Sequence, residues 1–232
     1  MNSAYNLNKL ELVIFDLAGT TVEDRGEVPA AFSSALAAHG LGVSAEQLKT
    51  VRGSSKRDAI LHLIPPGPER LSRAASVYAS FREQLTRRYR STGVHPVAGA
   101  AATFRSLRER GVRVAVNTGF DRETTALLLD VLGWSAGIFD AVVCGDDVTQ
   151  GRPAPYLIFH AMEAAGATSV ERVANVGDTV LDLHAGNNAG VGWNVGVLSG
   201  AHNRSMLQSV PHTHLLNSVA ELPDLWENQI MS

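Results

Sequence analysis

The sequence has few of the features that mark secreted, membrane-spanning or nucleic-acid-binding proteins. Its 232 residues include one cysteine, Cys144, so no disulfide can form within the chain. No apolar run approaches the roughly 20 residues that cross a bilayer, and the first residues lack the basic and apolar regions of a signal peptide. The net charge of −3 does not favour nucleic acid. We therefore expect a cytoplasmic protein whose partner is neither a membrane nor a nucleic acid.

The chain does contain a regular succession of strand-forming and helix-forming segments. Apolar residues make up 45% of the sequence, enough for one sizeable core and an accessory unit. From residue 99 onward, strands alternate with helices, which predicts a parallel, doubly wound α/β sheet. The helix near residue 160 is expected to start at Pro153, because proline is common at a first helical position. The expected strands are 112–116, 141–143, 173–176 and 193–197, and the expected helices are 99–110, 122–132, 153–164 and 181–189.

The region between residues 23 and 95 departs from this alternation. Two interpretations fit it, namely an extra helical layer on the sheet or a helical cap inserted over the strand ends. We assign residues 1–22 and 96–232 to an α/β core domain and residues 23–95 to a helical cap domain. The linkers near 23–27 and 92–97 would then be its hinges. The helices expected in this region are 29–39, 45–51, 56–63 and 69–90, with a proline-rich break at 65–68.

The most informative stretch is an apolar run that ends in a carboxylate. Residues 12–15 are apolar, Asp16 follows them, and a glycine turn with Thr20 and Thr21 comes next. An apolar run bounded by such a turn is typical of a buried strand. Ligands bind beyond the carboxyl ends of the strands in open α/β sheets. There Asp16 could attack phosphorus as a nucleophile, or it could cap the next turn.

Three later strand ends carry further polar residues that suit phosphate chemistry. The carboxyl ends of all strands in a parallel sheet face one edge, so we expect these residues to meet Asp16 there. Together they supply a nucleophile, a hydroxyl beside a backbone N–H, a cation and an acidic pair. Phosphoryl transfer needs this inventory because its catalysis is mostly positioning and charge neutralisation. The residues are Thr118 and Gly119, Arg152, and the pair Asp178 and Asp182.

The order of these motifs resembles that of the haloacid dehalogenase superfamily of phosphotransferases over nearly the whole chain. The first motif of that superfamily usually reads Asp-x-Asp-Gly-Thr, in which the second Asp is a general acid/base. Ala18 stands at that position here, and Asp-x-Ala-Gly-Thr-Thr is a peculiarity of the phosphonatase (phosphonoacetaldehyde hydrolase) branch. The resemblance implies a Rossmann-like α/β core with an inserted all-helical cap domain, and it favours the cap over an extra helical layer.

The resemblance also implies a Mg²⁺ ion at the strand ends. Asp16, the backbone carbonyl of Ala18 and Asp178 would bind it, since Mg²⁺ prefers hard oxygen ligands. Asp182 would bind the ion through a water molecule or would orient the residues that bind it directly. Thr20 would also support these residues. The ordinary alternative for Asp178 is a helix N-cap, a position that favours aspartate.

The remaining predicted contacts concern the phosphoryl group. The Thr118 hydroxyl and the Gly119 N–H would hold phosphoryl oxygens, and Arg152 would neutralise their charge. Arg152 could instead be an exposed arginine in a Gly-Arg-Pro loop. Arg52 would add a positive charge at the substrate. Structural roles in the core or in a loop cap are expected for Cys144, Asp146 and Asp147.

The role of Lys56 is the most open. Its Gly-x-x-Lys setting matches the lysine that forms a Schiff base in phosphonatases, which lets carbon leave phosphorus as an enamine. Such a lysine must be partly neutral at pH 7, through burial or a cationic neighbour. However, Ala59 and Arg52 stand where true phosphonatases carry His and Met. Lys56 could therefore be an electrostatic contact to a different phosphorylated substrate, or a solvated side chain.

The residues and the resemblance together predict a Mg²⁺-dependent hydrolase. It would cleave a small phosphorylated or phosphonate metabolite through an aspartyl-phosphate at Asp16, and in the specific form it would hydrolyse the C–P bond of phosphonoacetaldehyde. One alternative is a phosphomonoesterase or sugar-phosphate phosphatase, in which water, the substrate or His62 protonates the leaving group. Another is a non-catalytic homologue that binds a phosphorylated ligand. The apolar face of the helix 69–90 also permits a homodimer through the cap helices.

Overall fold

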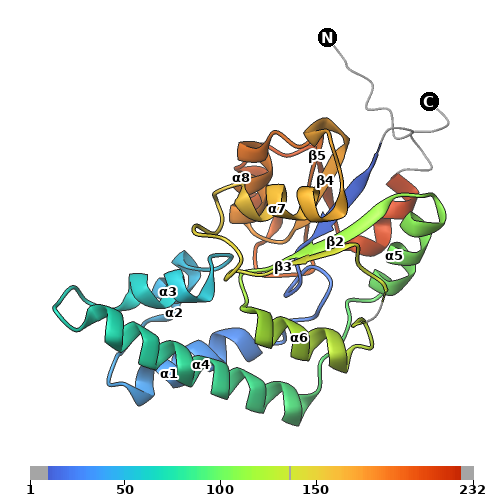
Figure 1. Cartoon of the computed structure of the whole chain (residues 1–232). Coiled ribbons are helices and arrows are strands. Elements are labelled where there is room, and N and C mark those ends of the chain that lie inside the picture. Colours follow the sequence, from blue (N-terminus) through green and yellow to red (C-terminus); the bar gives the residue numbers. More distant parts are fainter. Residues whose placement is uncertain (1–9, 136, 226–232) are drawn as a thin grey trace.

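A six-stranded parallel sheet forms the core of the computed structural model, which describes residues 10–135 and 137–225 (Figure 1). In space the strands follow the order β3-β2-β1-β4-β5-β6, and each neighbouring pair is parallel. This is the doubly wound order of Rossmann-like folds, so the predicted fold class is confirmed. The strands are β1 Leu12–Phe15, β2 Arg113–Asn117, β3 Ala141–Val143, β4 Val173–Gly177, β5 Trp193–Val197 and β6 His214–Leu216.

Strand β1 lies in the middle of the sheet and brings the sequence motifs together. All its residues are buried, as expected for a continuous apolar run in a parallel sheet that is covered on both faces. Phe15 is in register with Val116 of β2 and with Val176 of β4. The residues that follow these three strands therefore emerge at one edge of the sheet.

Helices cover both faces of the sheet. Because successive side chains of a strand point to opposite faces, Phe15 packs in the cluster that includes α5, and Ile14 packs in the cluster that includes α7 and α8. The rings of Phe15 and Phe104 meet edge to face, with their centroids 5.2 Å apart. The helices of the core are α5 Ala100–Glu109, α6 Arg122–Val131, α7 Tyr156–Ala165, α8 Val180–Ala189 and α9 Arg204–Gln208.

Three elements of the core differ from the prediction. Helix α7 begins at Tyr156 and not at Pro153, because residues 151–154 form a turn in which the Ala154 N–H donates to the Gly151 carbonyl at 3.0 Å. The short helix α9 and the edge strand β6 were not anticipated from the sequence. The three half-buried residues of β6 are too few to give the apolar pattern that identifies the inner strands.

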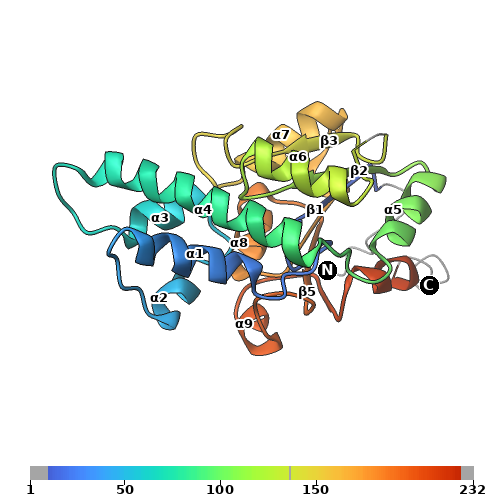
Figure 2. The same cartoon turned by 90° about the horizontal axis from the view of Figure 1, so that it is seen from below.

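Between β1 and α5 the chain forms a helical unit, which we call the helical insertion. Figure 2 shows α1 lying along α4, and the rings of Phe32 and Phe81 from these two helices are 4.4 Å apart. Most of its buried side chains form one cluster, which Phe120 and Leu128 of the core complete. No helix in the described part of the chain combines the length and apolarity needed to cross a membrane. The helices of the insertion are α1 Glu27–Ala38, α2 Ala45–Thr50, α3 Lys56–Leu63 and α4 Arg70–Thr92.

The chain enters and leaves the helical insertion through two adjacent segments. The Glu23 N–H donates to the His95 carbonyl at 2.9 Å, and the Val97 N–H donates to the Thr21 carbonyl at 2.9 Å. These paired connections lie just beyond the end of β1 and place the insertion beside the carboxyl edge of the sheet (Figure 1). The domain boundaries at residues 22/23 and 95/96, and the hinge role of the connections, stay predictions.

Candidate active site

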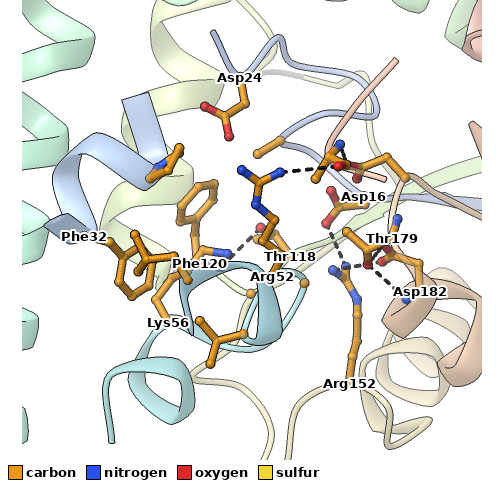
Figure 3. Close-up of a pocket in the computed structure, with 18 residues that line it drawn as sticks. Asp16, Asp24, Phe32, Arg52, Lys56, Thr118, Phe120, Arg152, Thr179 and Asp182 are labelled. Atoms are coloured by element: carbon orange, nitrogen blue, oxygen red, sulfur yellow. Dashed lines mark hydrogen bonds and ion pairs between the residues drawn. The ribbon is translucent and has the colours of Figure 1, made fainter. Parts of the chain in front are cut away.

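A pocket lies between the carboxyl edge of the sheet and the helical insertion (Figure 3). Its cavity volume is about 70 Å³. Thr20, which the sequence also singles out, is buried and does not line the pocket, but it donates a hydrogen bond to Asp178, which does. The other predicted site residues all line the pocket; they are Asp16, Ala18, Arg52, Lys56, Thr118, Gly119, Arg152, Asp178 and Asp182.

Asp16 occupies the end of β1, where its N–H donates to the Val176 carbonyl at 2.9 Å. The side chain is 8% exposed, and its Oδ1 lies 2.8 Å from Nη2 of Arg152. Burial raises the pKa of Asp16 to about 6, although the charge of Arg152 opposes the shift. The carboxylate is thus held by a guanidinium in a pocket, so the interpretation of Asp16 as a turn cap is not supported.

Arg152 is buried and connects two carboxylates. Besides its contact with Asp16, its Nη1 lies 2.9 Å from Oδ1 of Asp182, and its Nη2 donates to the Asn117 carbonyl at 3.1 Å. An ion pair that is shielded from water is much less screened than one at the surface. The interpretation of Arg152 as an exposed loop arginine is therefore wrong.

Asp178 is 1% exposed and receives two hydrogen bonds. The Thr20 hydroxyl donates to Oδ1 at 3.1 Å, and the Ala201 N–H donates to Oδ2 at 2.6 Å. Gly200 allows this close approach, since a Cβ there would lie 2.0 Å from Oδ2 of Asp178. Burial, followed by the negative charge of Asp16, raises the pKa of Asp178 to about 8.

The N-cap of α8 is Thr179, so the alternative interpretation of Asp178 as a helix cap is wrong. Asp182 completes a capping box with Thr179, whose N–H and hydroxyl donate to Oδ2 of Asp182 at 3.0 and 2.5 Å. Its other oxygen, Oδ1, pairs with Arg152. Both oxygens of Asp182 thus have partners within the protein, which fits an orienting role and not that of a metal ligand. The Thr-x-x-Asp spacing is a signal for this box that sequence reasoning missed.

The acidic residues at the strand ends fit a hard divalent cation. Asp16 and Asp178 are buried and line the same pocket, and the negative charge of Asp16 contributes to the raised pKa of Asp178, so a cation bound beside them would relieve this repulsion. Ala18 lines the same pocket and offers a backbone carbonyl. This set of oxygen donors is the kind that Mg²⁺ binds.

Thr118 and Gly119 follow β2. The Thr118 hydroxyl accepts the Phe120 N–H at 3.2 Å and keeps its own proton to donate. Gly119 has a second role that the sequence did not reveal: its carbonyl accepts the Lys56 N–H at 3.1 Å, and a Cβ on it would lie 2.7 Å from the Ser54 carbonyl oxygen. The helical insertion is thus in backbone contact with the core at Gly119.

Lys56 is the first residue of α3, and its side chain lines the pocket. Its Nζ lies 4.9 Å from the centroid of the Phe120 ring and 3.5 Å from the Ser54 carbonyl oxygen. Burial lowers the pKa of the Lys56 ammonium, while the charge of Asp16 opposes this shift. The neighbouring Arg57 points elsewhere, with its guanidinium 4.9 Å from the centroid of the Tyr78 ring. The interpretation of Lys56 as a merely solvated lysine is therefore not supported.

Other residues of the pocket wall were not predicted as site residues from the sequence. Pro29, Phe32, Leu48 and Val51 come from the helical insertion and give the pocket an apolar side. Gly53, Phe120 and Thr179 stand in the sequence motifs that carry the family resemblance, but they were given no role. His62, the candidate acid for a leaving group, is absent from the described residues that line the pocket. The remaining residues of this kind are Asp24 and Ala201.

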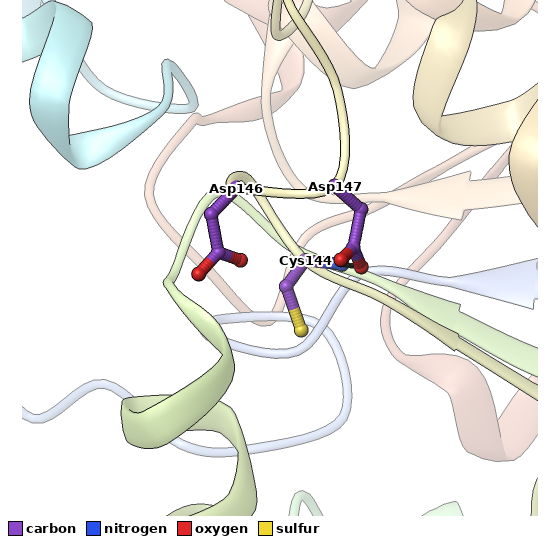
Figure 4. Close-up of side chains that lie close together, drawn as sticks. All are labelled: Cys144, Asp146 and Asp147. Atoms are coloured by element: carbon purple, nitrogen blue, oxygen red, sulfur yellow. Dashed lines mark hydrogen bonds between the residues drawn. The ribbon is translucent and has the colours of Figure 1, made fainter.

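Cys144, Asp146 and Asp147 lie together after β3, outside the pocket (Figure 4). Asp147 accepts the Cys144 N–H at 2.8 Å and pairs with Arg122, while Asp146 accepts the Arg122 N–H at 3.3 Å. Cys144 is buried, and burial raises the pKa of its thiol. The contacts agree with the expected roles in loop capping and in the core.

An α/β core with an inserted helical unit and an Asp-Thr-Arg-Asp pocket defines a class of hydrolases, and the chain belongs to it. The family model for haloacid dehalogenase-like hydrolases matches residues 13–195. Among curated relatives, phosphonoacetaldehyde hydrolase of Bacillus thuringiensis (strain Al Hakam) is 32% identical over 213 residues, covering 83% of this chain and 77% of the relative. The enzyme of the same name from Bacillus cereus (strain ATCC 14579) is 30% identical over 213 residues, covering 86% and 80%.

Solved structures share the fold. A phosphonoacetaldehyde hydrolase-like protein from Oleispira antarctica superposes with a TM-score of 0.83 at 21% identity, covering 95% of this chain and 92% of the other. CbbY from Rhodobacter sphaeroides, solved in complex with phosphate, gives a TM-score of 0.76 at 22% identity, covering 92% and 96%. A predicted phosphoglycolate phosphatase from Haemophilus somnus gives 0.74 at 18% identity, covering 94% and 98%.

Proposed function

We propose that this protein is a Mg²⁺-dependent hydrolase that releases phosphate from a small organophosphorus compound, with Asp16 as the nucleophile. The observation that carries the proposal is the position of Asp16. Its carboxylate lies in a small pocket, 2.8 Å from a buried arginine, and Thr118 and Lys56 line the same pocket. The names of the curated relatives make phosphonoacetaldehyde the first substrate to consider.

In the proposed reaction, Arg152 holds Oδ1 of Asp16, which leaves Oδ2 to form a bond to phosphorus. The bond between phosphorus and the leaving group breaks, and the leaving group takes the electron pair. Water then hydrolyses the aspartyl-phosphate and restores the carboxylate. Thr118 donates its hydroxyl proton in a hydrogen bond to the phosphoryl oxygens. When bound, Mg²⁺ would be held by Asp16, Asp178 and the Ala18 carbonyl and would offset phosphoryl charge.

Lys56 supports cleavage of a C–P bond. Its neutral amine condenses with the substrate aldehyde and takes up one proton from solvent, releasing water and forming a protonated imine. When the C–P bond breaks, its electron pair moves into the imine to give an enamine, and hydrolysis of the protonated enamine returns acetaldehyde and the lysine. The lowered pKa of Lys56 favours the neutral amine that the first step needs. Ala18 is compatible with this route, because no alkoxide has to be protonated.

Hydrolysis of a phosphate ester is the second candidate, and Arg52 is the observation that favours it. A charged side chain on the pocket wall suits an anionic sugar or acid phosphate better than a neutral aldehyde. The variant Ala18→Asp, which restores the acid/base of the wider superfamily, discriminates between the two. A large gain in ester hydrolysis would indicate that the substrate is a phosphate ester. Loss of C–P cleavage without such a gain would indicate that the substrate is a phosphonate.

The test is phosphate release from phosphonoacetaldehyde with Mg²⁺, in the wild type, Asp16→Asn and Lys56→Arg. We expect both variants to lose at least about a thousandfold in rate. Asp146→Asn is the matched control, since Asp146 is exposed and outside the pocket. Borohydride should trap the imine in the wild type, and localisation is simple because the chain has only three lysines, Lys9, Lys49 and Lys56. Turnover that survives in Asp16→Asn would refute the role of Asp16 as the nucleophile. If the protein were a non-catalytic homologue, it would release no phosphate from any compound in a panel of phosphate esters and phosphonates.

A further inference from the structure

The pocket contains a guanidinium that the proposed phosphoryl transfer does not use. Arg52 lies in the loop between α2 and α3, and its side chain crosses the pocket toward the core loop after β5 (Figure 3). There Nη1 donates to the Ala201 carbonyl at 3.3 Å. A guanidinium has five N–H donors, so most of its hydrogen-bonding capacity is left for something other than this carbonyl.

The carboxylates on the pocket wall do not account for that capacity. Asp16 and Asp182 are ion-paired with Arg152, and Asp178 accepts the Thr20 hydroxyl and the Ala201 N–H. Asp24 is held by backbone, with Oδ1 accepting the Gly26 N–H at 3.1 Å and the Val28 N–H at 3.3 Å. In the described part of the chain no carboxylate lies within ion-pair distance of Arg52.

The place of Arg52 sets which part of a ligand it can meet. The phosphoryl site is on the core, at Asp16 and Thr118, whereas Arg52 and Lys56 come from the helical insertion. A ligand whose phosphorus faces Asp16 therefore presents its opposite end to the insertion. Asp16, Thr118, Arg52 and Lys56 line one pocket, so both ends of such a ligand lie within it.

We propose that the substrate carries a second anionic group, a carboxylate, at the end opposite the phosphorus, and that Arg52 binds it. This proposal rests on the proposed function, because it places the phosphoryl group at Asp16. An arginine fork matches a carboxylate with two parallel hydrogen bonds. The substrate class is then a small phosphono- or phospho-carboxylate. Phosphonoacetaldehyde lacks the carboxylate that Arg52 would bind.

Binding of three non-hydrolysable phosphonates tests this without requiring turnover. The ligand 3-phosphonopropanoate carries the carboxylate, 3-methylbutylphosphonate has the same shape without charge, and propane-1,3-diphosphonate carries a second phosphoryl group. Calorimetry with Mg²⁺ present should give the wild type about a tenfold or greater preference for 3-phosphonopropanoate over 3-methylbutylphosphonate, since hydrogen bonds to charged groups contribute about 1.5–3 kcal/mol.

Arg52→Met should bring the ratio of these two affinities close to one and leave the affinity for inorganic phosphate within about twofold. Arg52→Lys should keep part of the preference, and Arg105→Met on the core helix α5 should keep all of it. If the only role of Arg52 were to hold the loop through its hydrogen bond to Ala201, its loss would weaken the binding of all ligands alike. The ratio of the two affinities would then stay unchanged, and this result would overturn the proposal. So would a wild type without preference, or one that prefers the diphosphonate. A strong carboxylate preference without turnover of phosphonoacetaldehyde would sustain this proposal and count against that substrate alone.

Discussion

The hydroxyl of Tyr78 donates a hydrogen bond to the carboxylate of Asp121, and this contact joins the helical insertion to the core. Tyr78 belongs to α4, whereas Asp121 is the N-cap of α6. Arg82 of α4 reaches the same carboxylate, with Nε 3.1 Å from Oδ2. Since Asp121 directly follows Phe120, this contact also helps to position the ring that faces Lys56.

Replacing Tyr78 with phenylalanine should destabilise the protein without changing its shape. The variant removes one hydrogen bond to a buried carboxylate, so we expect the free energy of unfolding to fall by about 1.5–3 kcal/mol. Urea denaturation followed by circular dichroism at pH 7 measures it. The control is Tyr156→Phe, whose ring is 42% exposed and which should change little. Equal stabilities of the two variants would contradict the role given to Tyr78.

Replacing Gly119 with alanine should impair the site more than the fold. The new Cβ would lie 2.7 Å from the Ser54 carbonyl oxygen, so the backbone of the helical insertion must shift away from the core. We expect kcat/KM for phosphate release to fall by about a hundredfold, because small misplacements of positioned groups have effects of that size. Gly42→Ala is the control, since a Cβ there meets nothing within 4 Å. Unchanged kcat/KM in Gly119→Ala would show that this contact does not position the site.

The amine of Lys56 should become reactive at a lower pH than an ordinary lysine. Burial lowers its pKa below the usual 10.5, so the neutral form appears at lower pH than it does for an exposed lysine. The rate of borohydride trapping with phosphonoacetaldehyde should therefore rise with pH and level off below pH 10.5. Peptide mass spectrometry compares Lys56 with Lys9 and Lys49 in the same sample. A trapping profile for Lys56 like that of a free lysine would contradict the shift.

Stability in metal-free buffer should decrease as the pH rises. The pKa of Asp178 is about 8 in the folded protein and near 3.8 when unperturbed, so between pH 4 and 8 the folded state holds a proton that the unfolded chain has released. The free energy of unfolding therefore falls with increasing pH across this window. Asp178→Asn should flatten the slope, since the amide does not titrate.

Added Mg²⁺ should reverse this loss in the wild type by binding the ionised carboxylates, and the effect should be absent in Asp178→Asn. Melting temperatures from pH 5 to 9, in EDTA and in Mg²⁺, measure both effects. Asp146→Asn is the control, and it should behave like the wild type. If the melting temperature changed with pH equally in the wild type and in Asp178→Asn, the carboxylate of Asp178 would not be the group that titrates.

The sequence by itself determined the fold class and most of the pocket. Continuous apolar runs such as 12–15 require burial on both faces, and their alternation with helices leaves a doubly wound sheet as the natural arrangement. Because parallel strands end at one edge, Asp16, Thr118, Arg152 and Asp178 had to meet there once the strands were found. Their chemistry could be predicted because it depends on residue type and on position at a strand end. Both can be recognised from a short stretch of the sequence.

Only the tertiary structure decided how the helical insertion meets that edge. The backbone contact of Gly119 with Ser54, the direction of Lys56 into the pocket, and the reach of Arg52 to Ala201 all join residues far apart in sequence. The same holds for Asp182, which pairs with Arg152 in addition to capping its own helix. Such contacts depend on packing between elements, which periodicity and local motifs do not encode.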